Sequence, residues 1–199
     1  RSAPAQGGVG AGAGATLGKL FGVAQAMKGG IGSASLRAGR FTVGALIAVN
    51  ALGDVRDPAT GRLLAGSRGA DGTSLRDAAA RLVAGDLPAG ALAGMATTIG
   101  VVATDAALTK AQANKLATMA HDGLARAISP VHTMTDGDTL FALATGTAEG
   151  HADLTVLGAL AAEVTARAIV NAITAATGLT LPDGTRLPAA TDLNQLERH

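Results

Sequence analysis

The amino-acid sequence predicts an α+β fold, in which separate strands and helices pack in layers around one core. Residues 41–49 and 98–104 are rich in β-forming side chains, whereas residues 154–177 carry apolar side chains at helical spacing. The chain has 199 residues and is 48% hydrophobic, which suffices to bury one sizeable core. We therefore expect a single domain over residues 1–199.

Local signals predict the first strand and the elements after it. Residues 41–49 form an almost continuous apolar run, which predicts a strand that is buried on both faces. Residues 57–61 read Asp-Pro-Ala-Thr-Gly and have turn chemistry, so residues 62–65 are expected to return as a hairpin partner. Ser74 is expected to cap a short helix that ends at Val83.

A linker, a strand and a helix follow in the middle of the chain. Residues 85–96 are rich in Gly, Pro and Ala, which predicts an exposed linker that is open to cleavage. Residues 98–104 predict a strand. Thr109 followed by Gln112 has the pattern of a capping box, which predicts a helix that Pro130 terminates.

The last predicted elements are a strand over residues 139–145 and a long helix. Asp153 is expected to cap this helix, and Gly178 is expected to end it. Glu163 and Arg167 lie one helical turn apart on it, which argues against a membrane span. The predicted order of strands and helices is therefore that of a layered α+β protein.

Composition excludes several classes of function. Sixteen Lys and Arg residues balance 15 Asp and Glu residues, and this net charge of +1 predicts neither a nucleic-acid partner nor a membrane partner. The absence of cysteine excludes disulfides and thiol catalysis. The four histidines lack metal-site spacing, so we expect no metal ion and no cofactor. The first residues show no apolar run of signal-peptide length, which favours a cytoplasmic location.

The junction between Ala96 and Thr97 has the properties of a self-cleavage site. A cut before Thr97 would give one residue both a hydroxyl nucleophile and a free α-amine. The reference pKa of an α-amine, about 7.7–8.0, suits a general base near neutral pH. We therefore expect two pieces, residues 1–96 and residues 97–199.

Three segments carry a resemblance to a known family. They are Thr97-Thr98-Ile99-Gly100-Val101-Val102-Ala103-Thr104-Asp105, Ala120-His121-Asp122-Gly123-Leu124-Ala125-Arg126 and Asp136-Gly137-Asp138-Thr139-Leu140-Phe141-Ala142. From about Gly7 to Thr174 the chain resembles the L-aminopeptidase/D-esterase family, which includes β-peptidyl aminopeptidases and 6-aminohexanoate-oligomer (nylon-oligomer) hydrolases. Its members are self-processing N-terminal-nucleophile hydrolases.

The resemblance implies several properties that the residues alone do not. It implies a four-layer α-β-β-α sandwich and a homo-oligomer, for example a tetramer of processed protomers. It implies a short peptide or another amide as substrate, including ω-amino-acid oligomers. Further sequence normally precedes the Gly-rich region at residues 7–18 in this family, so the chain is expected to lack its N-terminal part.

Five residues fall on the catalytic positions of the nylon-oligomer branch: Lys19, Asn50, Thr97, Asp136 and Asp138. Thr97 is then the nucleophile, Asn50 donates its amide N–H to the oxyanion, and Lys19 and the two carboxylates tune and orient the nucleophile. Each position also has a simpler interpretation. An Asn after a strand is usually a turn residue, a loop Lys is usually solvated, and Asp-Gly-Asp is typical of a surface turn.

One residue departs from the branch that this chain resembles. That branch has Asn immediately before the nucleophile, and this chain has Ala96. The carbonyl attacked during self-cleavage belongs to residue 96, so a changed side chain there can alter the cleavage rate through backbone geometry. Two functions follow: a self-processing amide hydrolase, or a catalytically silent or precursor-trapped member that acts as an assembly or binding protein.

Overall fold

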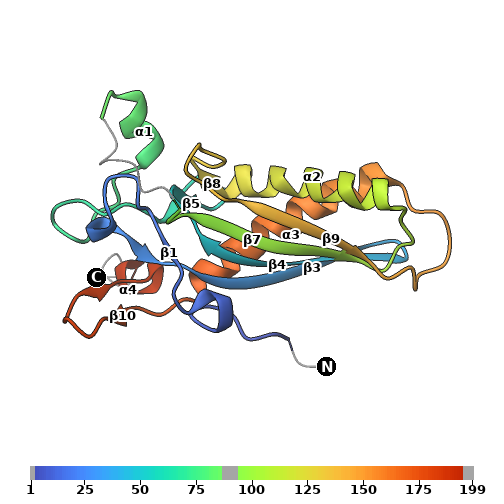
Figure 1. Ribbon diagram of the computed structural model, residues 1–199, viewed down its shortest axis with the longest axis horizontal. Coiled ribbons are helices and arrows are strands. Elements are labelled where there is room, and N and C mark those ends of the chain that lie inside the picture. The colour runs from blue at the N-terminus through green and yellow to red at the C-terminus, as the bar shows by residue number, and fades with distance from the viewer. Residues whose placement is uncertain (1–2, 87–93, 195–199) are drawn as a thin grey trace.

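A four-stranded sheet with two long helices on one face forms the centre of the molecule (Figure 1). The computed structural model describes residues 3–86 and 94–194. The main sheet has the order β3-β4-β7-β9, in which β9 runs parallel to β7 and the other neighbours are antiparallel. Its elements and the helices that cover it are β3 (Gly30–Ala38), β4 (Phe41–Asn50), β7 (Thr97–Thr104), β9 (Thr139–Ala144), α2 (Lys110–Ala127) and α3 (Leu154–Thr174).

Both long helices begin where the sequence predicts. The capping box of α2 is confirmed, because the side chains of Thr109 and Gln112 each bond to the other's backbone N–H. The carboxylate of Asp153 caps α3 by accepting the N–H of Thr155 at 2.7 Å. The helix ends at Thr174, before the expected stop at Gly178.

Small residues let α3 lie close against the sheet. A Cβ on Gly32 of β3 would lie only 2.1 Å from the carbonyl oxygen of Ala168. The helix is long and apolar enough to cross a membrane by length and composition, but most of its surface is buried inside the protein. Its Glu163–Arg167 pair, at 2.7 Å, lies on the exposed side. We therefore assign α3 as a core helix of the sheet–helix sandwich.

The prediction that β4 is buried on both faces was wrong. Its residues Val43, Ala45, Ile47 and Val49 are buried, whereas Thr42, Gly44 and Leu46 on the other face are only half-buried. That second face continues onto β7 and β9, where three apolar side chains are exposed: Ile99 by 45%, Phe141 by 58% and Leu143 by 52%. The described residues thus supply one helical layer and one main sheet, and the opposite face of that sheet is apolar and open.

A smaller sheet lies beside one end of the main sheet. It has the order β6-β5-β8, and the predicted hairpin around residues 57–61 is confirmed as the antiparallel pair of β5 and β6. The remaining elements are short and include two further antiparallel pairs, β1 with β2 and β10 with β11. They are η1 (Gly10–Gly12), β1 (Thr16–Leu17), η2 (Val23–Gln25), β2 (Met27–Lys28), β5 (Asp54–Arg56), β6 (Leu63–Ala65), β8 (Ile128–Ser129), β10 (Leu179–Thr180), β11 (Arg186–Leu187) and α4 (Ala190–Asn194).

The segment before β7 differs from the prediction in two ways. The short helix α1 (Ala78–Val83) is capped by Asp77, whose side chain accepts the N–H of Ala80, because Ser74 is held in a preceding turn. It stands away from the main sheet (Figure 1). Residues 87–93 of the expected linker lie outside the described residues. At the linker's end, Ala96 is only 1% exposed, so the expectation of an exposed segment was wrong there.

Candidate active site

The predicted cleavage junction lies at one end of the main sheet. Thr97 is the first residue of β7 and pairs directly with Asn50, the last residue of β4. Ala96, just before the strand, forms a parallel bridge with Asp136. Because pairing between strands fixes these neighbours, the sheet itself brings three of the predicted site residues to one place.

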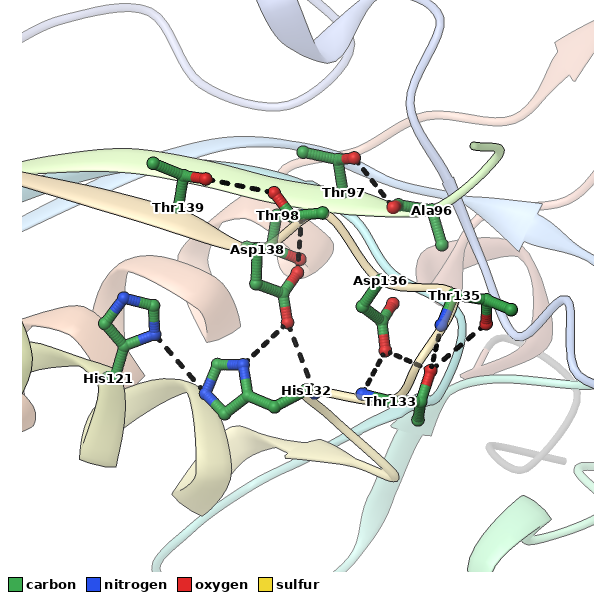
Figure 2. Close-up of polar contacts among 11 residues, drawn as sticks. Ala96, Thr97, Thr98, His121, His132, Thr133, Thr135, Asp136, Asp138 and Thr139 are labelled. Carbon is green, nitrogen blue, oxygen red and sulfur yellow. Dashed lines mark hydrogen bonds and ion pairs between the residues drawn. The ribbon is translucent and has the colours of Figure 1, made fainter. Parts of the chain in front are cut away.

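The hydroxyl of Thr97 lies against the carbonyl group that a cut would attack. Its Oγ1 donates a hydrogen bond to the carbonyl oxygen of Ala96 at 2.7 Å (Figure 2). The backbone N–H of Gly137 donates to the same oxygen at 3.0 Å. A Cβ on Gly137 would lie 2.7 Å from Thr97 Oγ1, so a larger residue would crowd the hydroxyl. Gly137 could not be identified as a donor from the sequence, because a backbone N–H leaves no signal in residue type.

Asn50 has its amide group oriented by three donors. Its Oδ1 accepts the backbone N–H of Thr16 at 3.1 Å, the hydroxyl of Thr16 at 3.4 Å and the ammonium of Lys19 at 2.9 Å. The amide nitrogen therefore faces the other way, toward the junction, where it donates to the carbonyl oxygen of Met95 at 3.2 Å. The acceptor, the carbonyl of Met95, belongs to the residue immediately before Ala96.

Lys19 is a buried cation rather than a solvated loop residue. It is only 2% exposed, and its Nζ donates to the carbonyl oxygen of Met95 at 2.6 Å as well as to both oxygens of Asn50. Burial lowers the pKa of Lys19 to about 8, while the nearby carboxylate of Asp136 opposes that shift. Lys19 thus remains mostly protonated at neutral pH. Among the described residues it makes no hydrogen bond to Thr97.

The two predicted carboxylates hold different parts of the site (Figure 2). Asp136 accepts the backbone N–H and the hydroxyl of Thr133, at 3.0 and 2.8 Å. Asp138 accepts the backbone N–H of Thr98 at 2.7 Å with one oxygen and contacts Nδ1 of His132 at 3.0 Å with the other. The side chain of Asp138 is only 3% exposed, so a plain surface turn does not describe it.

Two histidines that are 11 positions apart in the sequence meet at this site. His132 Nε2 lies 3.4 Å from Nδ1 of His121 on α2, and the two ring centroids are 4.9 Å apart. Asp138, His132 and His121 therefore form a continuous chain of polar contacts at this site. In the described ranges, no group of three or more His, Cys, Asp or Glu side chains has the geometry to hold a metal ion.

Comparison with known sequences relates the chain to one peptidase family. The sequence model of Peptidase family S58 matches residues 1–187. An uncharacterized aminopeptidase, ML1167, of Mycobacterium leprae is 44% identical over 188 residues, which cover 86% of this chain and 49% of the relative. A 6-aminohexanoate-oligomer endohydrolase of Kocuria sp. is 36% identical over 87 residues, which cover 38% of this chain and 24% of that enzyme. The chain thus spans about half the length of the mycobacterial aminopeptidases that it matches.

Comparison with solved structures supports the same relationship. A β-aminopeptidase of Burkholderia sp. matches with a TM-score of 0.62 and 27% identity, over 98% of this chain and 54% of that one. An L-aminopeptidase D-Ala-esterase/amidase of Ochrobactrum anthropi, described as a variant of the Ntn-hydrolase fold, matches with a TM-score of 0.65 and 23% identity. This second match covers 97% of this chain and 51% of that one. The likenesses confirm the predicted fold class.

Proposed function

The chain belongs to Peptidase family S58, and from that premise we propose that it is part of a self-processing amide hydrolase with Thr97 as its nucleophile. The observation that carries the proposal is the pair of hydrogen bonds on the carbonyl oxygen of Ala96, one from Thr97 Oγ1 and one from Gly137 N–H. The first donor belongs to the attacking group. The second lies where negative charge develops during the attack.

In the self-cleavage step, Thr97 Oγ attacks the carbonyl carbon of Ala96. The hydroxyl proton passes to the amide nitrogen of Thr97, and the carbon–nitrogen bond breaks. The product is an ester that joins Ala96 to Thr97 Oγ, beside a free α-amine on Thr97. Water then hydrolyses the ester, which leaves the carboxylate of Ala96 and restores the hydroxyl. Throughout, Gly137 N–H stabilises the oxyanion.

In the mature enzyme, the same hydroxyl attacks an amide substrate, and the freed α-amine accepts its proton. Cleavage also changes the role of Asn50. Its amide N–H donates to Met95 before the cut, and departure of residues 95 and 96 would free that donor for the oxyanion of a substrate. Lys19 keeps the amide in this orientation through its bond to Asn50 Oδ1.

The substrates that we propose are short peptides, cut at their N-terminal residue, or amides of ω-amino acids. The similarity to proteins named aminopeptidases and 6-aminohexanoate-oligomer endohydrolases supports these two classes. We further propose a homo-oligomer in the cytoplasm, with neither nucleic acid nor membrane as partner. The open apolar face around Phe141 supports packing of that face against a further layer.

The alternative is a precursor-trapped or silent member that acts as an assembly or binding protein. The observation behind it is Ala96, which packs with Leu20, Phe21, Leu52 and Ala78 in a small apolar cluster. This packing holds the uncut junction in place. It also means that an alanine fits the site, so Ala96 alone does not favour loss of activity.

Intact-mass analysis of the purified full-length protein separates the two functions. Self-processing gives two pieces, of which one ends at Ala96 and the other begins at Thr97. A single uncut mass that persists after prolonged incubation between pH 7 and 9, together with no hydrolysis of aminoacyl amides, would favour the assembly or binding protein.

A further inference from the structure

We propose that His132 is a positioning residue of the Thr97 site: it fixes the carboxylate of Asp138, and through it the start of β7, with His121 as its support on α2. The inference rests on the proposed function and adds to it two residues, His132 and His121, that act on the nucleophile indirectly. Neither histidine touches Thr97 among the described hydrogen bonds, so their effect is transmitted by Asp138.

The carboxylate of Asp138 connects the start of β7, where Thr97 lies, to the loop that carries His132. One oxygen accepts the N–H of Thr98 at 2.7 Å, directly after the nucleophile, and the other lies 3.0 Å from Nδ1 of His132 (Figure 2). Rotation of the carboxylate would break both contacts at once. Because the side chain is almost fully buried, water cannot readily replace either partner, and the orientation of Asp138 depends on His132.

His132 is itself held in the geometry that this contact needs. Its backbone has φ of 56°, in the left-handed region that residues other than Gly adopt uncommonly, with Asn, Asp and His enriched among them. In that conformation its backbone N–H also lies 3.4 Å from the same oxygen of Asp138 that its ring contacts. An uncommon backbone conformation in a residue whose ring and backbone N–H both contact one carboxylate oxygen is consistent with a functional constraint.

His121 supports the ring of His132 from the opposite side. If His132 carries its proton on Nδ1 toward Asp138, its Nε2 is an acceptor, and Nδ1–H of His121 at 3.4 Å can donate to it. Burial and the adjacent His132 lower the pKa of His121, while Asp138 and Asp122 oppose that shift. His121 is thus neutral near pH 7 and able to present one donor and one acceptor.

A pair of substitutions tests whether the Nδ1–H donor is what matters. In His132→Leu the donor is lost, whereas in His132→Asn the side-chain amide can donate from nearly the same place and the residue type also suits a positive φ. We expect His132→Leu to lower the rate of self-cleavage and kcat by about tenfold or more with KM within about twofold. His132→Asn should recover most of this loss. The matched control is His151→Leu, at an exposed histidine, which should behave as the parent.

A double-mutant cycle with Asp138→Asn tests the route of the effect. If His132 acts through Asp138, adding His132→Leu to Asp138→Asn should lower the rate by less than about twofold further. Fully additive losses, a His132→Leu variant as fast as the parent, or equal losses in the Leu and Asn variants would each overturn the proposal.

A measurement that needs no activity separates this proposal from the proposed function. Nitrogen-15 NMR of the imidazoles in full-length Thr97→Ala protein should show His132 protonated on Nδ1, with a resonance that moves in Asp138→Asn. The Nε2–H tautomer, or a resonance unaffected by Asp138→Asn, would overturn the positioning role. If the parent protein neither cuts itself nor hydrolyses amides, the proposed function fails, whereas the NMR result still decides whether His132 holds Asp138.

Discussion

Two buried lysines, Lys19 and Lys28, have the same local geometry and different surroundings. Each is almost fully buried, and each donates from its Nζ to three oxygen atoms. For Lys28 all three acceptors are backbone carbonyls, of Gly12, Ala15 and Gly29, at 2.7, 2.9 and 3.1 Å. For Lys19 one acceptor is the side chain of Asn50, at 2.9 Å.

The difference separates a structural clamp from a group placed for chemistry. Burial lowers the pKa of both lysines, but only Lys19 has a carboxylate, Asp136, that opposes the shift. Lys28 ties the loop at Gly12–Ala15 to β2 and the residue after it. Lys19 orients the amide donor of Asn50 beside the Thr97 hydroxyl and the Ala96–Thr97 junction. Burial of a lysine therefore does not by itself distinguish a structural role from a catalytic one. The groups that accept its hydrogen bonds do.

Removing the nucleophile beside Lys19 has the largest expected effect. We expect Thr97→Ala to give a single uncut chain under conditions in which the parent is cut, because the acyl shift needs the hydroxyl of Thr97. The matched control is Thr98→Val, since the buried hydroxyl of Thr98 has no hydrogen-bond partner among the described residues. Intact mass reports both variants. Continued cutting in Thr97→Ala would remove this mechanism.

The second largest effect on activity is expected at Asn50, whose side chain accepts a hydrogen bond from Lys19 and not from Lys28. Asn50→Ala in matured enzyme is expected to lower kcat by about 10²–10³, or about 2.7–4 kcal/mol, as loss of one oxyanion donor typically does. Steady-state kinetics on correctly processed protein measures it, with a native circular dichroism spectrum as the requirement for comparison. A near-normal kcat would reduce Asn50 to a turn residue and weaken the distinction between Lys19 and Lys28.

Lys28→Met should affect stability and not chemistry. It removes the ammonium donor from three buried carbonyl oxygens, although those of Gly12 and Ala15 still accept a backbone N–H, from Ala15 at 3.3 Å and from Gly29 at 2.8 Å. We therefore expect the free energy of unfolding to fall by about 1–3 kcal/mol. Relief of the cost of burying a charge offsets part of this loss. Denaturant titration measures the change, and kcat of the folded fraction should equal that of the parent. A large loss of kcat with unchanged stability would contradict the assignment of Lys28 as a clamp.

Lys19→Met should shift the pH dependence of hydrolysis to higher pH. The rate of hydrolysis is expected to rise as the α-amine of Thr97 loses its proton, with a reference pKa of about 7.7–8.0. The cation of Lys19 disfavours the protonated amine and lowers its pKa, so its removal should shift the rising limb to higher pH, by up to about one unit. The pKa of Lys19 itself, about 8, keeps it charged over the lower part of this limb.

Profiles of kcat/KM for the parent, Lys19→Met and Asp136→Asn decide the point. A limb that stays in place while the rate falls means that Lys19 positions the reacting groups without tuning the amine. A limb that responds only to Asp136→Asn would transfer the tuning to the carboxylate.

Ala96→Asn is expected to affect activity less than Thr97→Ala or Asn50→Ala. The reacting carbonyl is part of the backbone, so we expect the rate of cutting to change by less than about tenfold, a difference of about 1.4 kcal/mol. Because the side chain of Ala96 packs against Leu20 and Phe21, a buried amide there should lower stability by about 1–3 kcal/mol. Intact-mass analysis over time measures the rate of cutting in Ala96→Asn. Thermal unfolding of Ala96→Asn in the uncut Thr97→Ala protein measures the change in stability. A much faster cut would show that Ala96 slows maturation.

Elements with strong local signals could be predicted from the sequence. The apolar run at residues 41–49 and the capping residue Thr109 act over a few positions, and β4 and α2 form where these signals predict them. The burial of β4 was mispredicted because it depends on which layers cover the sheet. The cap of α1 was mispredicted because Asp71, rather than a helix, uses the hydrogen bonds of Ser74.

The candidate site was predicted by resemblance more than by pattern. Family membership is confirmed, while the roles of Lys19, Asn50, Thr97, Asp136 and Asp138 remain predictions that the geometry makes testable. The contact of Asp138 with His132 and the donor at Gly137 could not have been found from the sequence, because they depend on how the loop before β9 folds onto the start of β7. Residue types alone do not encode such tertiary contacts.

The position of Thr97 within the sheet has a consequence for the fate of the two pieces. A cut at its N-terminal side would leave β4 on one polypeptide and β7 on the other, joined by a ladder of eight residue pairs from Val43↔Thr104 to Asn50↔Thr97. The α3 helix of the second piece also packs across β3 and β4 of the first. The products would therefore be interleaved, like a split protein reassembled by strand complementation. They could separate only by unravelling the core, so the lifetime of the pair would equal that of the folded state.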